Sequence, residues 1–197
     1  AQLANKWPQL SAFIRLESPT VSPFMDFDST ESQWRTCYEQ LAPKLLLFAR
    51  QWISSSADAE DVVQVAFVRF WKHQPAAGPE HYPLLYAAVR SAALDHLRSA
   101  ERRVRREGDD RVEVTRGDAA VFDATLEQRE HAEVVQGALE SLPQAQREVV
   151  VLKIWGDLTF AQIAQTLGES INTIASRYRY ALEALRRQIK PCEYERV

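Results

Sequence analysis

The chain has little cysteine, and what it has is poorly placed for a metal site. Cys37 and Cys192 are the only two cysteines among 197 residues, and they form no CxxC or Cys/His cluster. The sequence therefore supports neither a zinc site nor a disulfide framework, and two reduced thiols are the simpler expectation. The four histidines also lack partners at metal or acid–base spacing, and no Gly-rich phosphate loop is present. We therefore expect no catalytic site, no metal, no cofactor and no small-molecule substrate.

Long apolar runs are also missing. No stretch approaches the roughly 18 apolar residues that a membrane span needs. The first residues lack a basic start followed by an apolar core, so we expect no signal peptide and a cytoplasmic protein without membrane insertion. Methionine occurs once, as Met25. Either the native start lies there or residues 1–24 are a genuine extension, and residues 1–31 are predicted to be irregular.

Charge of either sign is nearly balanced overall, with a formal net charge of −3, but it is unevenly distributed. Residues 81–106 hold six arginines against two acids, for a net +4, and residues 170–190 also carry a net +4. Residues 107–140 hold ten acids against three arginines, for a net −7. The two basic segments should attract phosphate, whereas the acidic segment between them should weaken DNA binding by the isolated protein.

Apolar residues recur at helical spacing from about residue 32. One stripe consists of Tyr38, Leu41, Leu45, Phe48 and Trp52. A second helix is expected to begin near Asp58, because acids suit the N-terminal end of the helix dipole, and to end before Pro75. A third helix is expected from about 83 to 105. Residues 32–106 therefore predict a first helical domain.

The second half of the chain carries local signals of helix starts and stops. Residues 107–124 show no clear period and predict a linker. The capping boxes Thr125–Gln128 and Thr159–Gln162 predict one helix that runs to Ser141 and another, shorter one. Pro143 suits the first turn of the helix between them, Gly168 suits a C-cap, and Ser170 can cap the last helix. Residues 125–190 predict a second helical domain and residues 191–197 a tail. The expected fold is all-α, with two small domains joined by an acidic linker.

A short capped helix, a glycine turn and a longer basic helix form the helix-turn-helix arrangement. The first helix braces against the DNA backbone, and the second presents its N-terminal half to base edges. The candidate DNA-contacting residues are Ser170, Asn172, Thr173, Ser176, Arg177, Arg179 and Tyr180. Arginine suits guanine, asparagine suits adenine, and hydroxyls suit phosphate or base. The alternative is a solvated helix of a bundle; the caps and the local charge favour DNA binding.

The third helix of the first domain mixes aromatic and basic residues. These are Tyr82, Tyr86, Arg90, His96, Arg98, Arg102 and Arg103. Stacking platforms beside a basic track suit single-stranded nucleic acid. Spacing alone slightly favours the alternative, in which the aromatics are core residues and the arginines are merely solvated.

Three segments together resemble one known family. Residues 58–72, 89–106 and 142–187 are similar to regions 2 and 4 of bacterial sigma factors, most of all those of the extracytoplasmic-function (ECF) group of the sigma-70 family, which keeps only these two regions. The resemblance covers roughly residues 32–106 and 125–189. It implies a factor that binds core RNA polymerase and promoter DNA and directs promoter-specific transcription initiation.

The resemblance also implies a role for individual residues. For docking on core polymerase it indicates Asp58, Glu60, Asp61, Gln64, Phe67, Arg69 and Trp71. For the melted −10 element it indicates Tyr86, Arg90, Ser91, Asp95, His96, Arg98, Arg102 and Arg103. For the −35 duplex it indicates the last helix, where Thr173, Ser176 and Arg177 match a Thr-x-x-Ser-Arg pattern. The acidic linker is expected to pass through polymerase channels otherwise used by nucleic acid, and an anti-sigma factor is a common partner in this group.

Three positions depart from the family pattern. Ser91 stands where Asn is frequent, Gln162 where Glu is usual, and Ala175 where Lys is usual. Ser91 should alter contact with an unpaired base, and the missing cation at 175 should lower the salt dependence of DNA binding by about one unit of slope. A second hypothesis is a helix-turn-helix regulator whose N-terminal part senses a ligand or oligomerises. The acidic helix followed by a basic–aromatic helix argues against it, because a sensor domain needs neither.

Overall fold

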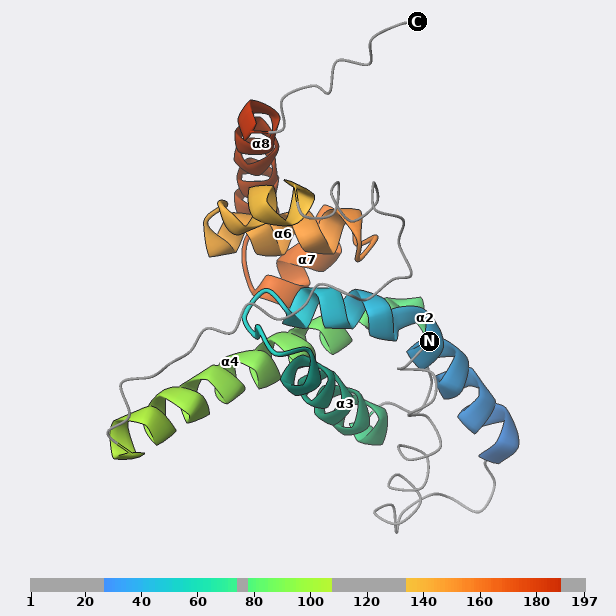
Figure 1. Cartoon of the computed structure of the whole chain (residues 1–197). Coiled ribbons are helices and arrows are strands. Elements are labelled where there is room, and N and C mark those ends of the chain that lie inside the picture. The colour runs from blue at the N-terminus through green and yellow to red at the C-terminus, as the bar shows by residue number, and fades with distance from the viewer. Residues whose placement is uncertain (1–26, 74–77, 108–133, 189–197) are drawn as a thin grey trace, which may run out of the picture. The chain divides into compact units, whose positions relative to one another are not determined.

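The computed structural model describes residues 27–73, 78–107 and 134–188, and within these ranges the regular elements are all helical (Figure 1). They are α2 (Phe27–Ala49), α3 (Ser56–His73), the short 3₁₀ helix η2 (Pro79–His81), α4 (Tyr82–Glu107), a helical segment over 134–140, α6 (Gln144–Ile154), α7 (Phe160–Leu167) and α8 (Ile171–Gln188). The chain divides into two compact units between Gly117 and Asp118, within the predicted linker. The prediction of an all-α fold is confirmed.

In the first unit α2, α3 and α4 pack against one another around an aromatic core. Phe67 of α3 meets the rings of Trp34 and Tyr38 edge-on, at centroid distances of 5.7 and 4.9 Å. Such edge-to-face pairs add to the free energy of burial itself. The predicted stripe of α2 is buried from Tyr38 to Phe48, but Trp52 lies beyond the end of the helix and is half-buried.

The start of α2 differs from the prediction. The helix begins at Phe27, five residues before the predicted start of the domain, so residues 27–31 are not irregular. These residues carry no apolar period of their own. Once tertiary packing holds the downstream turns, adding residues to an existing helix is favourable, whereas starting one is not.

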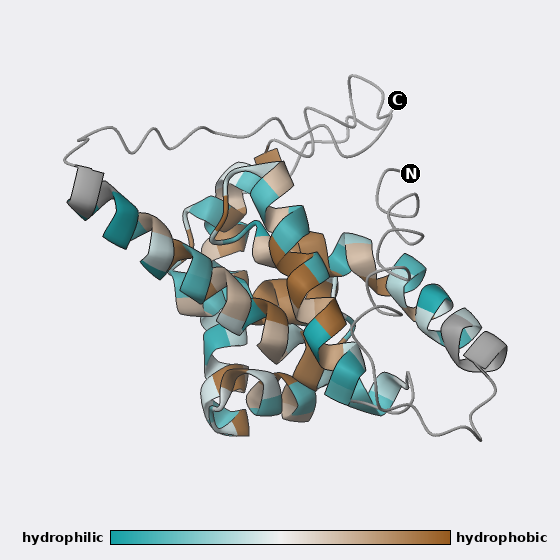
Figure 2. Ribbon diagram, turned by 90° about the horizontal axis from the view of Figure 1, so that it is seen from below, coloured by the Kyte–Doolittle hydropathy of each residue, from teal (hydrophilic) through white to brown (hydrophobic). Residues whose placement is uncertain are grey.

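Helix α3 begins and ends close to its predicted limits. The backbone N–H of Asp58 donates to Ser55 Oγ at 3.3 Å, which satisfies one of the free donors of the first turn. Seven residues of α3 are buried: Ala59, Val62, Val63, Ala66, Phe67, Val68 and Phe70. Hydrophobic segments gather where the helices face one another (Figure 2). The seven buried residues therefore form the packed face of α3.

Helix α4 is longer than the predicted 83–105 by one or two residues at each end. Its fully buried apolar side chains, from Leu85 to Ala93, all lie in the N-terminal half. Between Arg98 and Arg105 the described side chains are exposed except for the small, partly buried Ala100. The N-terminal half therefore anchors α4, while the arginine-rich half is open to solvent.

The second unit contains α6, α7 and α8 and a smaller core. Leu142, Val150 and Ala181 are buried, and five partly buried side chains pack against them: Leu139, Trp155, Tyr178, Ala184 and Leu185. The helical segment 134–140 is the described part of the helix predicted to end at Ser141. The first residue of the predicted linker 107–124, Glu107, is the last residue of α4. The rest of that linker, the capping box Thr125–Gln128 and the tail from 191 lie outside the described residues.

Two local predictions in the second unit are confirmed. The Gln162 amide donates to Thr159 Oγ1 at 3.2 Å, and the Thr159 amide donates to Gln162 Oε1 at 2.8 Å, which completes a capping box for α7. Gly168 ends α7 at φ 69°, a left-handed conformation that favours glycine. Pro143 lies at the N-cap position, directly before α6. None of the described helices is long and apolar enough to span a membrane.

Candidate nucleic-acid interface

The start of α8 is fixed by two hydroxyl side chains. The backbone amide of Thr173 donates to Ser170 Oγ at 3.1 Å, so Ser170 caps α8 as predicted. The hydroxyls of Ser170 and Thr173 are also hydrogen-bonded to each other, at 2.8 Å. Both residues were predicted to contact DNA. In this structure their hydroxyls hold the first turn of α8 in place.

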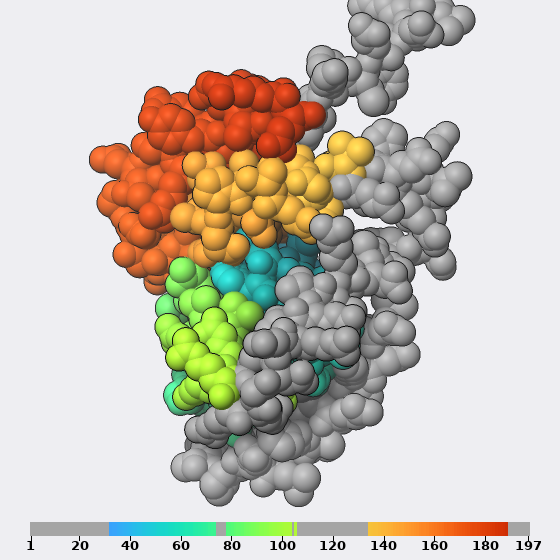
Figure 3. All heavy atoms as spheres, turned by 60° about the vertical axis from the view of Figure 1, so that its left-hand side comes forward, coloured from blue at the N-terminus to red at the C-terminus, as the bar shows by residue number. Residues whose placement is uncertain are grey.

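One side of α8 forms an exposed polar stripe. Asn172, Ser176 and Arg179 recur at spacings of four and three residues and are all exposed. Beside them, Tyr180 is 52% exposed and the Arg179 guanidinium lies over its ring, 5.0 Å from the centroid. Atoms of α8, in red, form part of the visible surface in the space-filling view (Figure 3). Four of the seven predicted −35 residues therefore share one accessible surface.

Arg177 does not belong to this stripe. It lies three residues after Ile174 and four before Ala181, which are both fully buried. Its side chain is 29% exposed, and Nη2 donates to Glu169 Oε1 at 3.0 Å. The prediction placed Arg177 among the base-reading residues, whereas the structure places it beside the core with its guanidinium directed to the turn.

Two residues near the start of α8 were missed by the sequence prediction. Ile171, the first residue of α8, is 53% exposed although it is large and apolar. Glu169, in the turn between α7 and α8, is the ion-pair partner of Arg177. The signal for Ile171 was present in the sequence, because an apolar residue directly after a capping serine precedes the buried stripe. The pairing of Glu169 spans eight positions and carries no sequence signature.

In the first unit, the exposed side of α4 carries a ridge of four residues. Ser91, Asp95, Arg98 and Arg102 recur at spacings of four, three and four and are exposed, and Arg103 is exposed beside them. Arg98 donates to Asp95 at 3.1 Å, and Arg102 Nε donates to the Arg98 carbonyl at 3.1 Å. With these contacts, the guanidinium groups of Arg98 and Arg102 lie along α4.

The other predicted −10 residues lie nearer the core. Arg90 and His96 are half-buried, and His96 Nε2 lies 4.0 Å from the Asp58 carboxylate of α3. Tyr86 is 1% exposed and belongs to the buried stripe with Leu85 and Val89. The ring fills the aromatic core, as the core alternative expects, so in this structure it is not exposed as a stacking platform for DNA bases.

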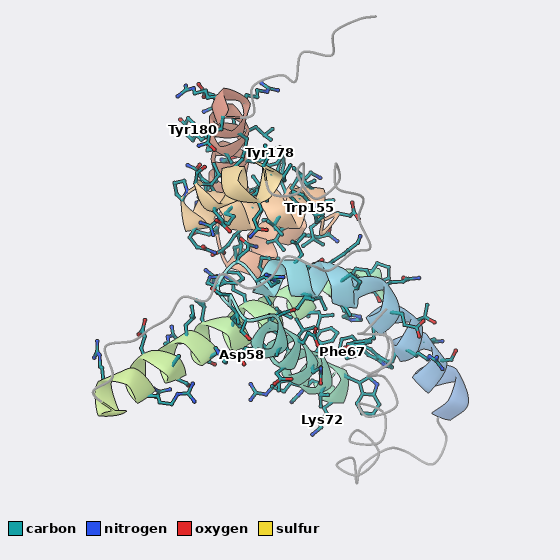
Figure 4. The ribbon with its side chains drawn as sticks, in the orientation of Figure 1. Asp58, Phe67, Lys72, Trp155, Tyr178 and Tyr180 are labelled. Carbon is teal, nitrogen blue, oxygen red and sulfur yellow. The ribbon has the colours of Figure 1, made fainter. Side chains whose placement is uncertain are left out.

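The predicted polymerase-docking residues lie on two stripes of α3. Asp58, Asp61 and Arg69 are exposed on one side; Glu60, Gln64 and Trp71 are partly exposed on the next. Phe67 belongs to the second stripe but is fully buried between Trp34 and Tyr38, so its side chain is not exposed beside the other predicted docking residues. Figure 4 shows Asp58 and Lys72 near opposite ends of α3, with Phe67 between them.

The pKa of two core residues is shifted by their surroundings. Burial raises the pKa of the Cys37 thiol to about 11 and, together with the charge of Glu60, raises the pKa of Tyr38 to about 12. Both groups stay neutral at physiological pH. The described residues hold no group of three or more potential metal ligands.

The two units match two known families of domain. The family model "Sigma-70 region 2" matches residues 37–103, and "Sigma-70, region 4" matches residues 132–185. The chain belongs to the sigma-70 family. This sigma factor directs transcription initiation at promoters, with α2 to α4 in region 2 and α6 to α8 in region 4.

Similar curated proteins are ECF sigma factors. The ECF RNA polymerase sigma factor SigL from Mycobacterium tuberculosis is 30% identical over 156 residues, which cover 77% of this chain and 86% of the relative. The ECF RNA polymerase sigma factor RpoE from Cereibacter sphaeroides is 26% identical over 162 residues, or 81% of this chain and 87% of the relative. The identification of the ECF group from the sequence is confirmed.

Solved structures share the fold of this sigma factor. RpoE from Bartonella quintana, in complex with the anti-sigma factor NepR, aligns with a TM-score of 0.61 at 22% identity, over 81% of this chain and 98% of that one. CnrH, in complex with the cytosolic domain of CnrY, aligns with a TM-score of 0.54 at 19% identity, over 92% of this chain and 94% of that one.

Proposed function

We propose that this sigma factor uses three separate surfaces: α3 for core polymerase, the exposed ridge of α4 for the unpaired −10 strand, and the exposed stripe of α8 for the −35 duplex. The observation that carries the proposal is that each unit holds an exposed basic helix surface on the side away from its buried stripe. The same helices that complete the two cores therefore present cations to DNA.

The chemistry of the α8 stripe suits duplex recognition. An α-helix fits the major groove, where Arg179 can donate to guanine O6 and N7 and Asn172 can pair with adenine. Ile171, exposed at the first position of α8, can contact a thymine methyl group. Ser170 and Thr173 keep the first turn in place through their cap. Reading by a few N-terminal residues of a helix is how helix-turn-helix domains bind.

The α4 ridge suits a single strand held through its phosphates. Arg98, Arg102 and Arg103 follow one another along the open half of the helix. Because Tyr86 is buried, base recognition cannot depend on stacking against that ring. We assign phosphate contact to the three arginines and base contact to Ser91, Asp95 and the half-buried Arg90 and His96.

Helix α3 suits a basic surface on the polymerase. Asp58 and Asp61 lie exposed in its first turns, where they also face the positive end of the helix dipole. Charged groups at the rim of an interface mainly steer association and select the partner. Exposed Arg69 and the partly exposed Glu60, Gln64 and Trp71 complete the surface that we assign to core polymerase. The acidic linker is assigned to cationic channels of the polymerase.

We further propose an anti-sigma factor as a partner. Two structural neighbours were solved with protein partners, RpoE with the anti-sigma factor NepR and CnrH with the cytosolic domain of CnrY. Val65 is an exposed apolar residue on the same side of α3 as Asp61 and Arg69, so a protein that covers it would also block polymerase docking. The expected behaviour is competition: a co-purifying anti-sigma factor should be displaced by excess core polymerase.

The proposal is tested by transcription from a promoter library. Purified chain is mixed with bacterial core polymerase and templates randomised at the −35 and −10 elements, and run-off transcripts are sequenced. We expect transcripts only with both proteins, and base preferences at both elements. Specific and tight binding of the chain alone to duplex DNA, without transcripts in the presence of core, would favour an ordinary helix-turn-helix regulator.

A further inference from the structure

We propose that Glu169 is a positioning residue for −35 recognition. Its ion pair with Arg177 joins the turn to α8 and keeps the Arg177 guanidinium away from the bases. The inference deepens the proposed reading of the −35 element by α8 and rests on it. In this proposal neither Glu169 nor Arg177 contacts a base. Both determine how the exposed stripe of α8 is presented to DNA.

The geometry of the pair places it beside the exposed stripe. Arg177 lies on the same side of α8 as the buried residues Ile174 and Ala181. Long side chains on a helix run back toward its N-terminus, and the Arg177 guanidinium meets Glu169 just before α8 begins, at 3.0 Å. With 29% and 38% of the two side chains exposed, the pair is neither fully solvated nor fully buried.

Glu169 is attached to both helices of the motif. Its backbone amide donates to the Ala164 carbonyl of α7 at 3.1 Å, and its carboxylate accepts from Arg177 of α8. The neighbouring Gly168 and Ser170 end one helix and begin the next. A residue bonded on both sides of a short turn limits the change in angle between α7 and α8. This angle decides how the stripe of Asn172, Ser176 and Arg179 enters the groove.

Electrostatics give Arg177 a second task. The N-terminus of a recognition helix approaches DNA phosphates, and a lone carboxylate there is repelled. Arg177 neutralises Glu169 at this place. Removal of Arg177 alone therefore leaves an uncompensated anion near the phosphates. An Arg177→Ala variant loses affinity for that reason, even though the side chain reads no base.

Exchanging the charges of Glu169 and Arg177 distinguishes a positioning role from direct recognition of bases. E169R and R177E each place like charges in contact, and we expect each to lower −35-dependent transcription by roughly tenfold or more. The double variant E169R/R177E restores an opposite pair. We expect it to return to within about threefold of the parent, with the same base preference at every −35 position. Core binding is measured alongside, because all three variants should retain it.

Two outcomes would overturn the inference. If E169R/R177E stays as inactive as R177E, or transcribes with a changed preference at any −35 position, Arg177 itself reads DNA. Each variant is first checked for cooperative thermal unfolding. Where charge reversal prevents folding, E169Q/R177Q is used instead: an unchanged base preference supports positioning, and a changed preference contradicts it.

A separate variant tests the proposed role of the exposed stripe of α8, on which the inference rests. R179A should change the base preference, because it removes a side chain of the stripe. If R179A leaves the preference unchanged while the charge exchange restores transcription, the assignment of the stripe fails but the positioning pair stands. If R179A changes the preference and the exchange does not restore transcription, only the positioning pair fails.

Discussion

The Tyr86 ring of α4 packs edge-on against Phe48 of α2, with ring centroids 5.4 Å apart and ring planes at 84°. This contact joins α4, the helix that we assign to the −10 strand, to α2 of the core. Tyr86 is one of the aromatic residues for which the sequence suggested a base-stacking role. Region 2 therefore anchors α4 through its aromatic end and leaves its basic end exposed.

The first prediction concerns Tyr86. Y86A should destabilise region 2 by about 3–5 kcal/mol, because it removes a large buried ring. Y86F keeps the ring and should leave −10 base preference unchanged. The measurements are thermal unfolding and sequencing of transcripts from a −10 library. A changed −10 base preference in a folded Y86F protein would show that Tyr86 contacts DNA.

The second prediction concerns the α4 ridge. R98A and R102A should each weaken binding of a single-stranded −10 oligonucleotide by holoenzyme, and should each lower the salt slope by about 0.7, the value for one phosphate contact. R35A on α2 is the matched control, since Arg35 is also exposed and also paired, with Glu39. Equal salt slopes in all three variants would show that the ridge does not contact phosphate.

The sequence predicted what depends on near neighbours. The capping box of Thr159 and Gln162, the glycine stop at 168 and the cap at Ser170 span at most four residues, and all three are present. The extra turn at the start of α2 depends on packing further along the chain. It could not be read from residues 27–31.

At three predicted site residues, residue type and position on the helix favour different interpretations. Tyr86, Phe67 and Arg177 are each of a type that suits a binding surface, but each lies on the buried side of its helix. Spacing alone already favoured a core position for Tyr86, which lies between Leu85 and Val89, and Arg177 lies between Ile174 and Ala181 at the margin of the buried stripe. The partner of Arg177 could not have been found, because the turn geometry that brings Glu169 close is set by the packing of α7 and α8.

The third prediction concerns the start of α7. T159A removes the oxygen that accepts from the Gln162 amide and should lower the free energy of unfolding of region 4 by about 1 kcal/mol. For a unit of this size the melting temperature should fall by about 4–8 °C. T159S keeps the oxygen and serves as the control. If T159A and T159S have the same melting temperature, the capping box contributes nothing to stability.

The fourth prediction concerns polymerase docking. D61R reverses an exposed charge on α3 and should weaken binding of core polymerase by roughly tenfold or more, while −35 recognition is unaffected. E39R reverses an exposed charge on α2 and should bind core nearly as well as the parent. Affinity is measured by titration of labelled sigma factor with core. Similar losses in both variants would point to a general effect of net charge and not to a docking surface on α3.

The last prediction concerns the buried thiol of Cys37. Burial raises its pKa to about 11, because a thiolate loses its solvation inside the core. The thiolate is the reactive species, so at pH 8 only about one thiol in a thousand is ionised, against roughly a quarter of ordinary cysteines. In a C192S variant, where Cys37 is the sole thiol, reaction with a disulfide reagent should be at least about a hundredfold slower in the folded protein than in denaturant.

The same shift predicts the direction of two pH profiles. The rate of thiol reaction in folded C192S should rise about tenfold per pH unit up to about pH 11. The free energy of unfolding should fall between about pH 9 and 11, because the thiol of the unfolded chain ionises first. Denaturant titrations at a series of pH values measure the second effect, and C37A/C192S, which has no thiol, is the control. Fast reaction of folded C192S at pH 8 would mean that the Cys37 thiolate is stabilised by its surroundings and not disfavoured by them.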